Sequence, residues 1–268
     1  MAWDAVNNWV AEADVPGVAV ALVGRSGVEE LHFAGTAKAD SLFALASLTK
    51  PIVAIAALVA AEEGTIELDA PVGDHLAEYR DAARATITAR HLLAHASGLP
   101  EIAKGVPPLE VQPVRPPATR RAYSNEGYHV LGALIEAASG IEYRRYVTEA
   151  VLRPLDMDAF LPLPDEESGR DLASIQWPGL EGGLESYPKM HCPDWGLGLN
   201  VRGSGDPHWC GDAVSPATLS HFGASGTLMW ADPVAGRGLV CLANRSTYSG
   251  WMMRPGRWAE LTAQVLAT

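Results

Sequence analysis

The pattern of apolar positions predicts strands at both ends of the chain. Residues 15–35 form two apolar runs joined by a glycine-containing turn, which predicts a β-hairpin. Residues 220–232 and 237–245 again have strand-like runs, and a helical pattern over 256–268 closes the chain. Strands at both ends with helices between them indicate an α+β fold in which one sheet is built from both termini.

The middle of the chain follows a helical period and contains two irregular stretches. Residues 105–120 are rich in proline and therefore form neither a helix nor a central strand. Residues 161–215 hold many Pro, Gly and Trp and show little periodicity. The expected helices cover residues 46–64, 87–99, 125–140 and 143–157, the first two ending at Gly64 and Gly98 and the last stopped by Pro154.

These elements predict a single domain over residues 1–268 that has two lobes. A sheet lobe is expected over about 1–45 and 216–268, and a helical lobe over about 46–215. A chain of 268 residues that is 48% hydrophobic is long enough to bury a full core.

The charge of the chain excludes several classes of partner. Its 20 basic and 32 acidic residues give a net charge of −12, which argues against nucleic acid and anionic membranes because no basic field offsets phosphate repulsion. No apolar run approaches the ~20 residues that a membrane span requires. Neither nucleic acid nor a membrane is therefore expected as a partner, and the sequence leaves the oligomeric state open.

The first residues do not have the pattern of a secretory signal. They lack a basic region and an uninterrupted apolar region, and instead predict a short amphipathic helix with Trp3, Val6, Trp9 and Val10 on one face. A cytoplasmic location is therefore expected, and a processed secreted protein stays open. Three cysteines, an odd number, do not make a disulfide framework.

A serine and a lysine stand three residues apart where the first long helix begins. The S-x-x-K pattern occurs twice, as Ser47 with Lys50 and Ser186 with Lys189. Residues i and i+3 share one face of a helix, so Lys50 can approach the Ser47 hydroxyl. Pro51 requires the helix to begin close to Ser47, which then lies at the positive end of the helix dipole. Ser186 has no apolar helix behind it and is expected in a loop, whereas an ordinary N-cap remains the alternative for Ser47.

Two further segments supply groups that acyl transfer needs. Tyr123 and Asn125 stand just before a predicted helix, in YSNEGY. A run of small residues follows His221 on a predicted strand, where glycines let a ligand approach the backbone closely. Together with Ser47 and Lys50, these residues provide a nucleophile, groups to carry its proton, an amide to orient a substrate, and strand N–H groups. This set suits acyl transfer through a serine ester.

Six stretches of the chain resemble motifs of a known family and occur in the same order as in that family. They are LFALASLTKP, EEGTIELDAPVGDHL, ITARHLLAHASGLP, YSNEGYHVLGALIEAASG, RPLDM and HFGASGTLMWADP with GLVCLANR. They closely resemble the serine β-lactamase-related family, which includes class C β-lactamases, D-alanyl-D-alanine carboxypeptidases and family VIII carboxylesterases. The resemblance covers about residues 15–160 and 195–247. It implies a β-lactamase/transpeptidase-like fold, with an antiparallel sheet flanked by helices, and acyl transfer from a small-molecule ester or amide substrate without metal or cofactor.

The resemblance also implies roles for the residues of the first two motifs. Ser47 matches the nucleophile that is acylated, and Lys50 matches its proton partner. Tyr123 matches the tyrosine that acts as general base or proton relay, and Asn125 matches the amide that orients the substrate.

The third motif differs in type from that of many members. His221, Phe222 and Gly223 stand where the family has Lys-Thr-Gly or His-x-Gly, and the implied oxyanion hole is the backbone N–H of Ser47 and of Ala224. Most members also carry a further helical stretch between the second and third motifs. In this chain residues 161–215 stand in its place and are much shorter. The helical lobe is therefore expected to be reduced and the cleft more open.

Other residue pairs have both a functional and an ordinary interpretation. His91 and His95 have a spacing that suits a metal, but no glutamate stands between them as in H-E-x-x-H, and a structural role is favoured. The irregular segment holds residues suited to a zinc site or to a Cys192–Cys210 disulfide, and plain loop residues are the alternative: His191, Cys192, His208 and Cys210.

Tryptophan is concentrated in the second half of the chain. Trp177, Trp195 and Trp209 lie in the irregular segment, where they are candidates for the wall of an apolar acyl pocket. Ordinary core packing is the alternative for all three.

The candidate functions come from different classes. The leading hypothesis is a serine hydrolase that forms an acyl-enzyme at Ser47 and acts as a carboxylesterase or acyltransferase on small uncharged esters. A β-lactamase or D-amino-acid peptidase using the same residues is the first alternative. A catalytically silent binding protein of the same fold is the second, and a zinc-dependent hydrolase is a further one.

Overall fold

The computed structural model describes residues 3–12, 15–157, 172–183, 194–205, 207–246 and 256–268. The second S-x-x-K pair at Ser186 and Lys189, together with His191 and Cys192, lies outside the described residues. The chain forms two compact units, one of residues 1–49 with 200–268 and one of residues 50–199. Residues 46–49 and 200–215 thus group with the sheet, whereas the sequence boundaries assigned them to the helical lobe.

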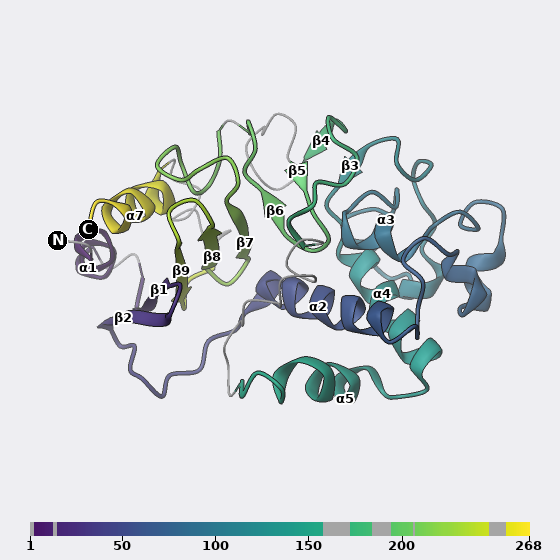
Figure 1. The fold of residues 1–268 in the computed structure, drawn as a ribbon, viewed down its shortest axis with the longest axis horizontal. Coiled ribbons are helices and arrows are strands. Elements are labelled where there is room, and N and C mark those ends of the chain that lie inside the picture. Colours follow the sequence, from purple (N-terminus) through teal and green to yellow (C-terminus); the bar gives the residue numbers. More distant parts are fainter. Residues whose placement is uncertain (1–2, 13–14, 158–171, 184–193, 206, 247–255) are drawn as a thin grey trace. The chain divides into compact units, whose positions relative to one another are not determined.

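The main sheet is antiparallel and is built from both ends of the chain, as the sequence predicts. Its seven strands follow the order β2-β1-β9-β8-β7-β6-β5, which puts β1 between its hairpin partner and the last strand (Figure 1). The strands are β1 (Gly17–Gly24), β2 (Gly27–Gly35), β5 (Asp194–Trp195), β6 (Asn200–Val201), β7 (Leu219–Gly223), β8 (Thr227–Asp232) and β9 (Arg237–Ala243).

The register shows how the two ends of the chain meet in β1. On one side the β1–β2 hairpin runs from Gly17 opposite Gly35 to Gly24 opposite Gly27. On the other side Val18 lies opposite Ala243 at the far end of β9. Strand β1 is paired along both edges, and most of its residues are buried, which agrees with its nearly continuous apolar run.

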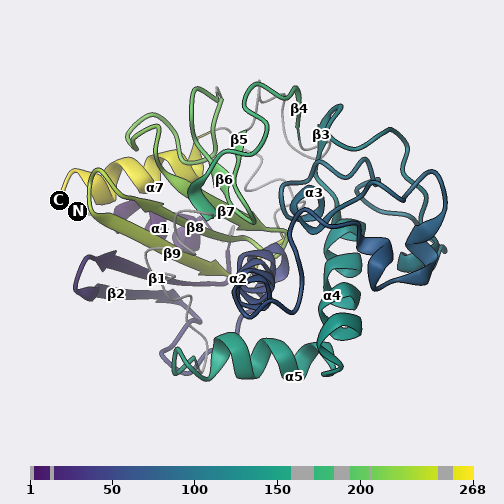
Figure 2. The same ribbon diagram turned by 45° about the vertical axis from the view of Figure 1, so that its right-hand side comes forward.

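Two terminal helices pack on the sheet of the first unit. They are α1 (Asp4–Ala11) and α7 (Arg257–Leu266), which contact each other, and α1 also contacts β1 and β2 (Figure 2). Their buried residues, among them Trp9 and Trp258, recur at helical spacing, so each helix turns one apolar stripe inward.

The second unit is mainly helical. Its α-helices among the described residues are α2 (Thr49–Glu62, whose first residue belongs to the first unit), α3 (Ala89–Leu93), α4 (Asn125–Ser139) and α5 (Tyr143–Val147), the last continuing as the π-helix η5 (Thr148–Leu152). Short 3-10 turns are η1 (Ala46–Leu48, in the first unit), η2 (Val72–Asp74), η3 (Ala77–Arg80) and η4 (Pro108–Glu110). The two-residue strands β3 (Arg121–Ala122) and β4 (Gly182–Gly183) pair in parallel. Within the part of the chain described, no helix is long and apolar enough to cross a membrane.

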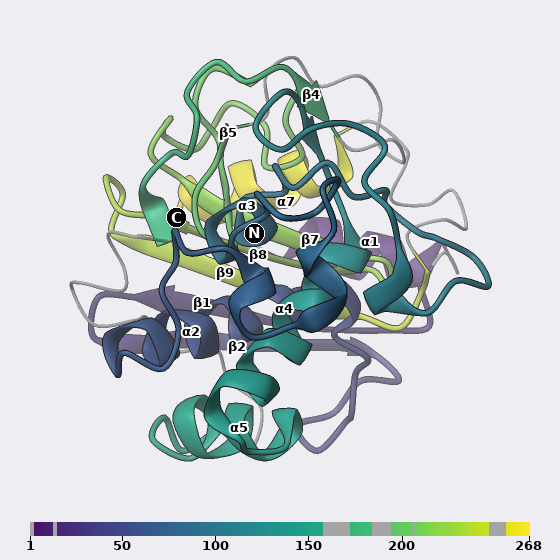
Figure 3. The same cartoon turned by 90° about the vertical axis from the view of Figure 1, so that its right-hand side faces the viewer.

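The long helices begin and end where their residues require it. Helix α2 is buried on nearly all sides over Lys50–Leu58, and Gly64 follows it with φ +72°, as expected for a C-terminal glycine. Ser124 caps α4 by accepting the Gly127 N–H at 2.9 Å, and Gly140 ends it with φ +70°. Helix α4 contacts α3 and α5 (Figure 3).

One predicted helix is shorter than its pattern indicates. The prediction of a helix to Gly98 is wrong, because α3 ends at Leu93 and His95 has a left-handed backbone with φ +55°. The short helix is instead fixed at its start by a capping box between Thr88 and His91.

Candidate active site

Ser47 lies in a short turn that leads directly into α2. Thr49 begins α2 and Pro51 stands in its first turn, as the sequence predicts. Ala46, the residue before Ser47, has φ +50°, a conformation that costs energy in a residue with a Cβ. The turn that carries Ser47 is therefore held in a backbone shape that its local sequence does not favour.

The β7–β8 hairpin of the same unit holds the segment before Ser47. The Thr227 hydroxyl donates to the Leu45 carbonyl oxygen at 3.0 Å, and the Ser225 hydroxyl donates to the Ala44 carbonyl. A Cβ at position 223 would collide with the Leu45 carbonyl oxygen, so the close approach requires Gly223. Turn η1 thus contacts the end of β7 that carries Gly223 and precedes Ala224.

His221 and Phe222 occupy opposite faces of β7. The Phe222 ring lies 5.2 Å from the Trp258 ring of α7 and 5.0 Å from that of Trp209. Phe222 is therefore on the face of the sheet that α7 covers, and His221, one residue earlier, is on the other face. The His221 side chain is buried, and its Nδ1–H donates to the Phe222 carbonyl oxygen at 2.8 Å.

Lys50 is the centre of a cluster in the second unit. Its Nζ donates to Asn125 Oδ1 at 2.6 Å and lies 4.7 Å from the centre of the Tyr123 ring. The same Nζ lies 5.5 Å from the centre of the Tyr128 ring. The structure thus brings together three of the predicted residues, Lys50, Tyr123 and Asn125.

Burial changes the acidity of this lysine. The Lys50 side chain is only 7% exposed, and loss of water lowers its pKa to about 8, although the nearby Glu101 carboxylate acts in the opposite direction. A lysine with this pKa is partly neutral near pH 8 and can accept a proton from a hydroxyl.

Tyr128 is a member of this cluster that the sequence analysis did not identify. It lies one helical turn after Asn125 in α4, and its hydroxyl donates to the Leu93 carbonyl oxygen at 3.2 Å. The i, i+3 spacing from Asn125 is the signal that predicts a shared helix face.

The three candidate tryptophans have different surroundings. Trp195 lies 5.9 Å from the Tyr123 ring, so it borders the Lys50 cluster. Trp177 stacks on His91 at 4.8 Å, and Trp209 packs in the first unit, where its Nε1–H donates to the Ser220 hydroxyl at 3.0 Å. Trp209 is therefore a core residue of the sheet unit.

Four of the histidines and cysteines considered for metal or disulfide roles lie in the described residues, and their surroundings favour structural roles. His91 takes part in the capping box of α3, and His95 lies beyond the end of that helix, so helical i, i+4 geometry does not relate them. His208 Nε2 donates to Asn200 Oδ1 at 2.8 Å, and Cys210 is a free buried thiol rather than half of a disulfide. No group of three potential metal ligands occurs within the described ranges.

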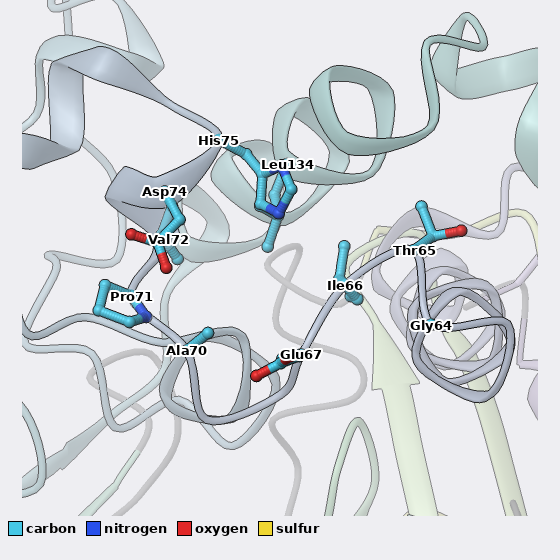
Figure 4. A pocket seen from close by; sticks show the side chains of 10 residues that line it. All are labelled: Gly64, Thr65, Ile66, Glu67, Ala70, Pro71, Val72, Asp74, His75 and Leu134. Carbon is cyan, nitrogen blue, oxygen red and sulfur yellow. The ribbon is translucent and has the colours of Figure 1, made fainter.

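A pocket of about 220 Å³ lies elsewhere in the second unit (Figure 4). It is lined by residues 64–67, 70–72, 74 and 75 together with Leu134. Its Gly64 edge follows the C-terminal end of α2, whereas Lys50 is at the start of that helix, about 20 Å away along its axis. The pocket therefore contains none of the predicted catalytic residues.

The seven-stranded antiparallel sheet flanked by helices is the β-lactamase/transpeptidase-like fold. The sequence also matches the Beta-lactamase family model over residues 4–193, so the chain belongs to the beta-lactamase family. A solved beta-lactamase from Mycobacterium bovis is 35% identical, with 98% of each chain covered and a TM-score of 0.82.

Two curated relatives match shorter stretches. Esterase EstB of Burkholderia gladioli is 50% identical over 64 residues, which cover 22% of this chain and 16% of EstB. Penicillin-binding protein 4* of Bacillus subtilis is 30% identical over 140 residues, which cover 45% of this chain and 30% of that protein. The matched regions thus span less than a third of these relatives.

Proposed function

We propose that this protein is a serine hydrolase that forms an acyl-enzyme at Ser47 and acts on small uncharged esters, as a carboxylesterase or acyltransferase. The observation that carries the proposal is the buried Lys50 ammonium, bonded to Asn125 and set against Tyr123, with a pKa near 8. Because its pKa is near 8, a buried lysine of this kind can accept the proton of a serine hydroxyl close to neutral pH.

The proposed reaction has two steps. The Lys50–Tyr123 pair takes the Ser47 hydroxyl proton while Ser47 Oγ attacks the ester carbonyl, and the same proton is returned to the alcohol when the ester C–O bond breaks. Water or a second alcohol then attacks the acyl carbon, its proton passes through the Lys50–Tyr123 pair to Ser47 Oγ, and the bond between the acyl carbon and Oγ breaks. The backbone N–H groups of Ser47 and Ala224 stabilise the oxyanion in both steps.

The preference for uncharged substrates rests on the third motif. His221 replaces a lysine, and an unperturbed histidine is mostly neutral at pH 7. Phe222 replaces a threonine, and its ring is packed against Trp258. A substrate carboxylate would therefore lack a charge-assisted hydrogen bond worth about 1.5–3 kcal/mol. The likeness to Esterase EstB supports the same reading.

A second candidate is hydrolysis of β-lactams or of D-amino-acid peptides by the same residues. It is favoured by the 35% identity to a protein described as a beta-lactamase. Both candidates use Ser47, so they differ only in the substrate that donates the acyl group to it.

The deciding comparison is kcat/KM for p-nitrophenyl butyrate and for nitrocefin, with Ser47→Ala as the blank. We expect the ester to be turned over at least about tenfold more efficiently, because a single charge-assisted bond lost by the anionic substrate corresponds to that factor. More efficient cleavage of nitrocefin would replace the esterase proposal with the β-lactamase candidate.

A further inference from the structure

His95 has no role in the proposed reaction, yet it is bound to both sides of Tyr123. Its side chain is 1% exposed, and its carbonyl oxygen accepts the Ala122 N–H at 2.9 Å. Its Nδ1 accepts the Ser124 N–H at 3.2 Å. One residue therefore holds the backbone N–H of the residue before Tyr123 and that of the residue after it.

The rings of this region also meet at His95. The His95 ring centre lies 4.3 Å from that of Tyr123, and Trp195 meets the imidazole edge-on at 4.7 Å. Tyr128, whose ring also approaches Lys50, is 5.2 Å from His95. The imidazole is thus enclosed by the aromatic rings that border the lysine.

Regular secondary structure does little to hold Tyr123. Strand β3 ends one residue earlier after only two residues, and the Tyr123 N–H reaches the Gly183 carbonyl at a long 3.4 Å. Helix α4 begins only at Asn125. The contacts with His95 therefore add restraint on both sides of Tyr123 that regular secondary structure does not supply.

The conformation of His95 is consistent with a specialised role. It has φ +55°, a left-handed conformation that residues with a Cβ adopt at a cost, with Asn, Asp and His the most tolerant. This backbone shape turns both the carbonyl oxygen and the imidazole toward the 122–124 segment. Strain of this kind persists only where the surrounding structure fixes it.

We infer that His95 is the positioning residue that holds Tyr123 in place for proton transfer with Lys50, through hydrogen bonds to the backbone N–H groups of the two residues that flank the tyrosine. The inference rests on the proposed function, because it assumes that Tyr123 carries a proton. Nδ1 must stay unprotonated to accept the Ser124 N–H, so the imidazole is the tautomer with its proton on Nε2.

Three substitutions separate the contributions of His95. His95→Phe keeps an aromatic ring but removes the acceptor, and His95→Gly tolerates positive φ but has neither ring nor acceptor. His95→Asn tolerates positive φ and restores an acceptor near the position of Nδ1. With p-nitrophenyl butyrate we expect His95→Phe and His95→Gly to lower kcat roughly 10- to 100-fold with KM changed less than about threefold, the scale of a misplaced catalytic group. His95→Asn is expected to recover most of that loss.

A double-mutant cycle tests whether His95 acts through Tyr123. In the Tyr123→Phe background, His95→Phe should lower kcat by less than about threefold, because the group that it positions is gone. Equal losses in both backgrounds, or a fully active His95→Gly, would overturn the inference. Circular dichroism and melting temperature check folding, and the Asn and Gly variants decide if His95→Phe does not fold. If Ser47→Ala and Tyr123→Phe keep the parent kcat, the proposed function itself fails.

Discussion

At the scale of single residues, the candidate chemistry depends on how Lys50 is removed from water. Its ammonium donates to the amide oxygen of Asn125 and lies against the rings of Tyr123 and Tyr128. Because loss of water is the larger effect, the neutral form is favoured more than in an exposed lysine. Replacement of Lys50 or of Tyr123 therefore tests the proposed proton transfer most directly.

Tyr123→Phe is expected to lower kcat roughly 100-fold or more while the protein stays folded, because the ring remains and only the proton-carrying hydroxyl is lost. Lys50→Ala should lower kcat at least as much. Steady-state kinetics with p-nitrophenyl butyrate measure both, with melting temperatures as the control for folding. A nearly normal kcat in Tyr123→Phe would mean that Lys50 handles the proton alone.

Ser47 should be the residue that an alkyl fluorophosphonate labels, because only an activated serine attacks phosphorus readily. Intact mass and peptide mapping identify the modified residue, and Ser47→Ala is the control. Labelling at another serine would refute the assignment of Ser47, and absence of labelling would favour a silent binding protein.

The pH profile follows from the pKa of Lys50. A base is active when neutral, so kcat/KM should rise with pH and level off above about 8, the pKa of Lys50. Rates at each pH are corrected with Ser47→Ala for spontaneous ester hydrolysis. A profile that is flat from about pH 6.5 to 9 would contradict a role for Lys50 as the base.

At the scale of elements, a buried polar network supports the strands that lead to the third motif. Asn200 Oδ1 in β6 accepts from His208 Nε2 at 2.8 Å and from the Ser220 hydroxyl in β7 at 3.3 Å. His208 Nδ1 accepts the Cys210 N–H at 3.1 Å. Both ring nitrogens are therefore engaged in a way that requires neutral histidine, with its proton on Nε2.

This network predicts how stability depends on pH. Burial lowers the pKa of His208 to about 3 in the folded protein, below the ~6.5 of an unfolded chain. Between these values the unfolded state binds more protons, so the contribution of His208 is present above pH ~6.5 and is lost as pH falls toward 3. The free energy of unfolding should fall by about 2 kcal/mol from pH 7 to 5 through this group alone.

Urea unfolding of the parent and of His208→Gln at both pH values measures this dependence. The variant should be less stable at pH 7, and its stability should change less between pH 7 and 5, since other titrating groups are common to both proteins. Equal pH dependence in the two proteins would show that His208 does not contribute.

At the scale of the whole molecule, net charge biases which substrates arrive. With a charge of −12, the protein repels anions over distances of about a Debye length. For p-nitrophenyl hemisuccinate, kcat/KM should therefore rise as salt is raised from about 20 to 500 mM, whereas that for the neutral butyrate should stay nearly constant. A salt effect of the same size on both esters would assign it to the enzyme rather than to steering.

The sequence by itself determined the features that depend on neighbouring residues. Two apolar runs joined by a glycine-containing turn predicted the β1–β2 hairpin, and Pro51 with Gly64 predicted where α2 begins and ends. The position of Ser47 just before that helix follows from the same local signals. Family resemblance then gave the fold and the roles proposed for Lys50, Tyr123 and Asn125. The structure shows that Lys50 contacts the other two residues.

Tertiary structure decided what lies side by side without being close in sequence. The HLLAH pattern predicted a longer helix, but contacts with residues 122–124 hold His95 in a left-handed conformation that ends it. Phe222 lies on the α7 face of β7 because Trp209 and Trp258, distant in sequence, pack there. Likewise the pKa of Lys50 reflects burial by residues some 75 positions away, and no local pattern encodes how much water such packing excludes.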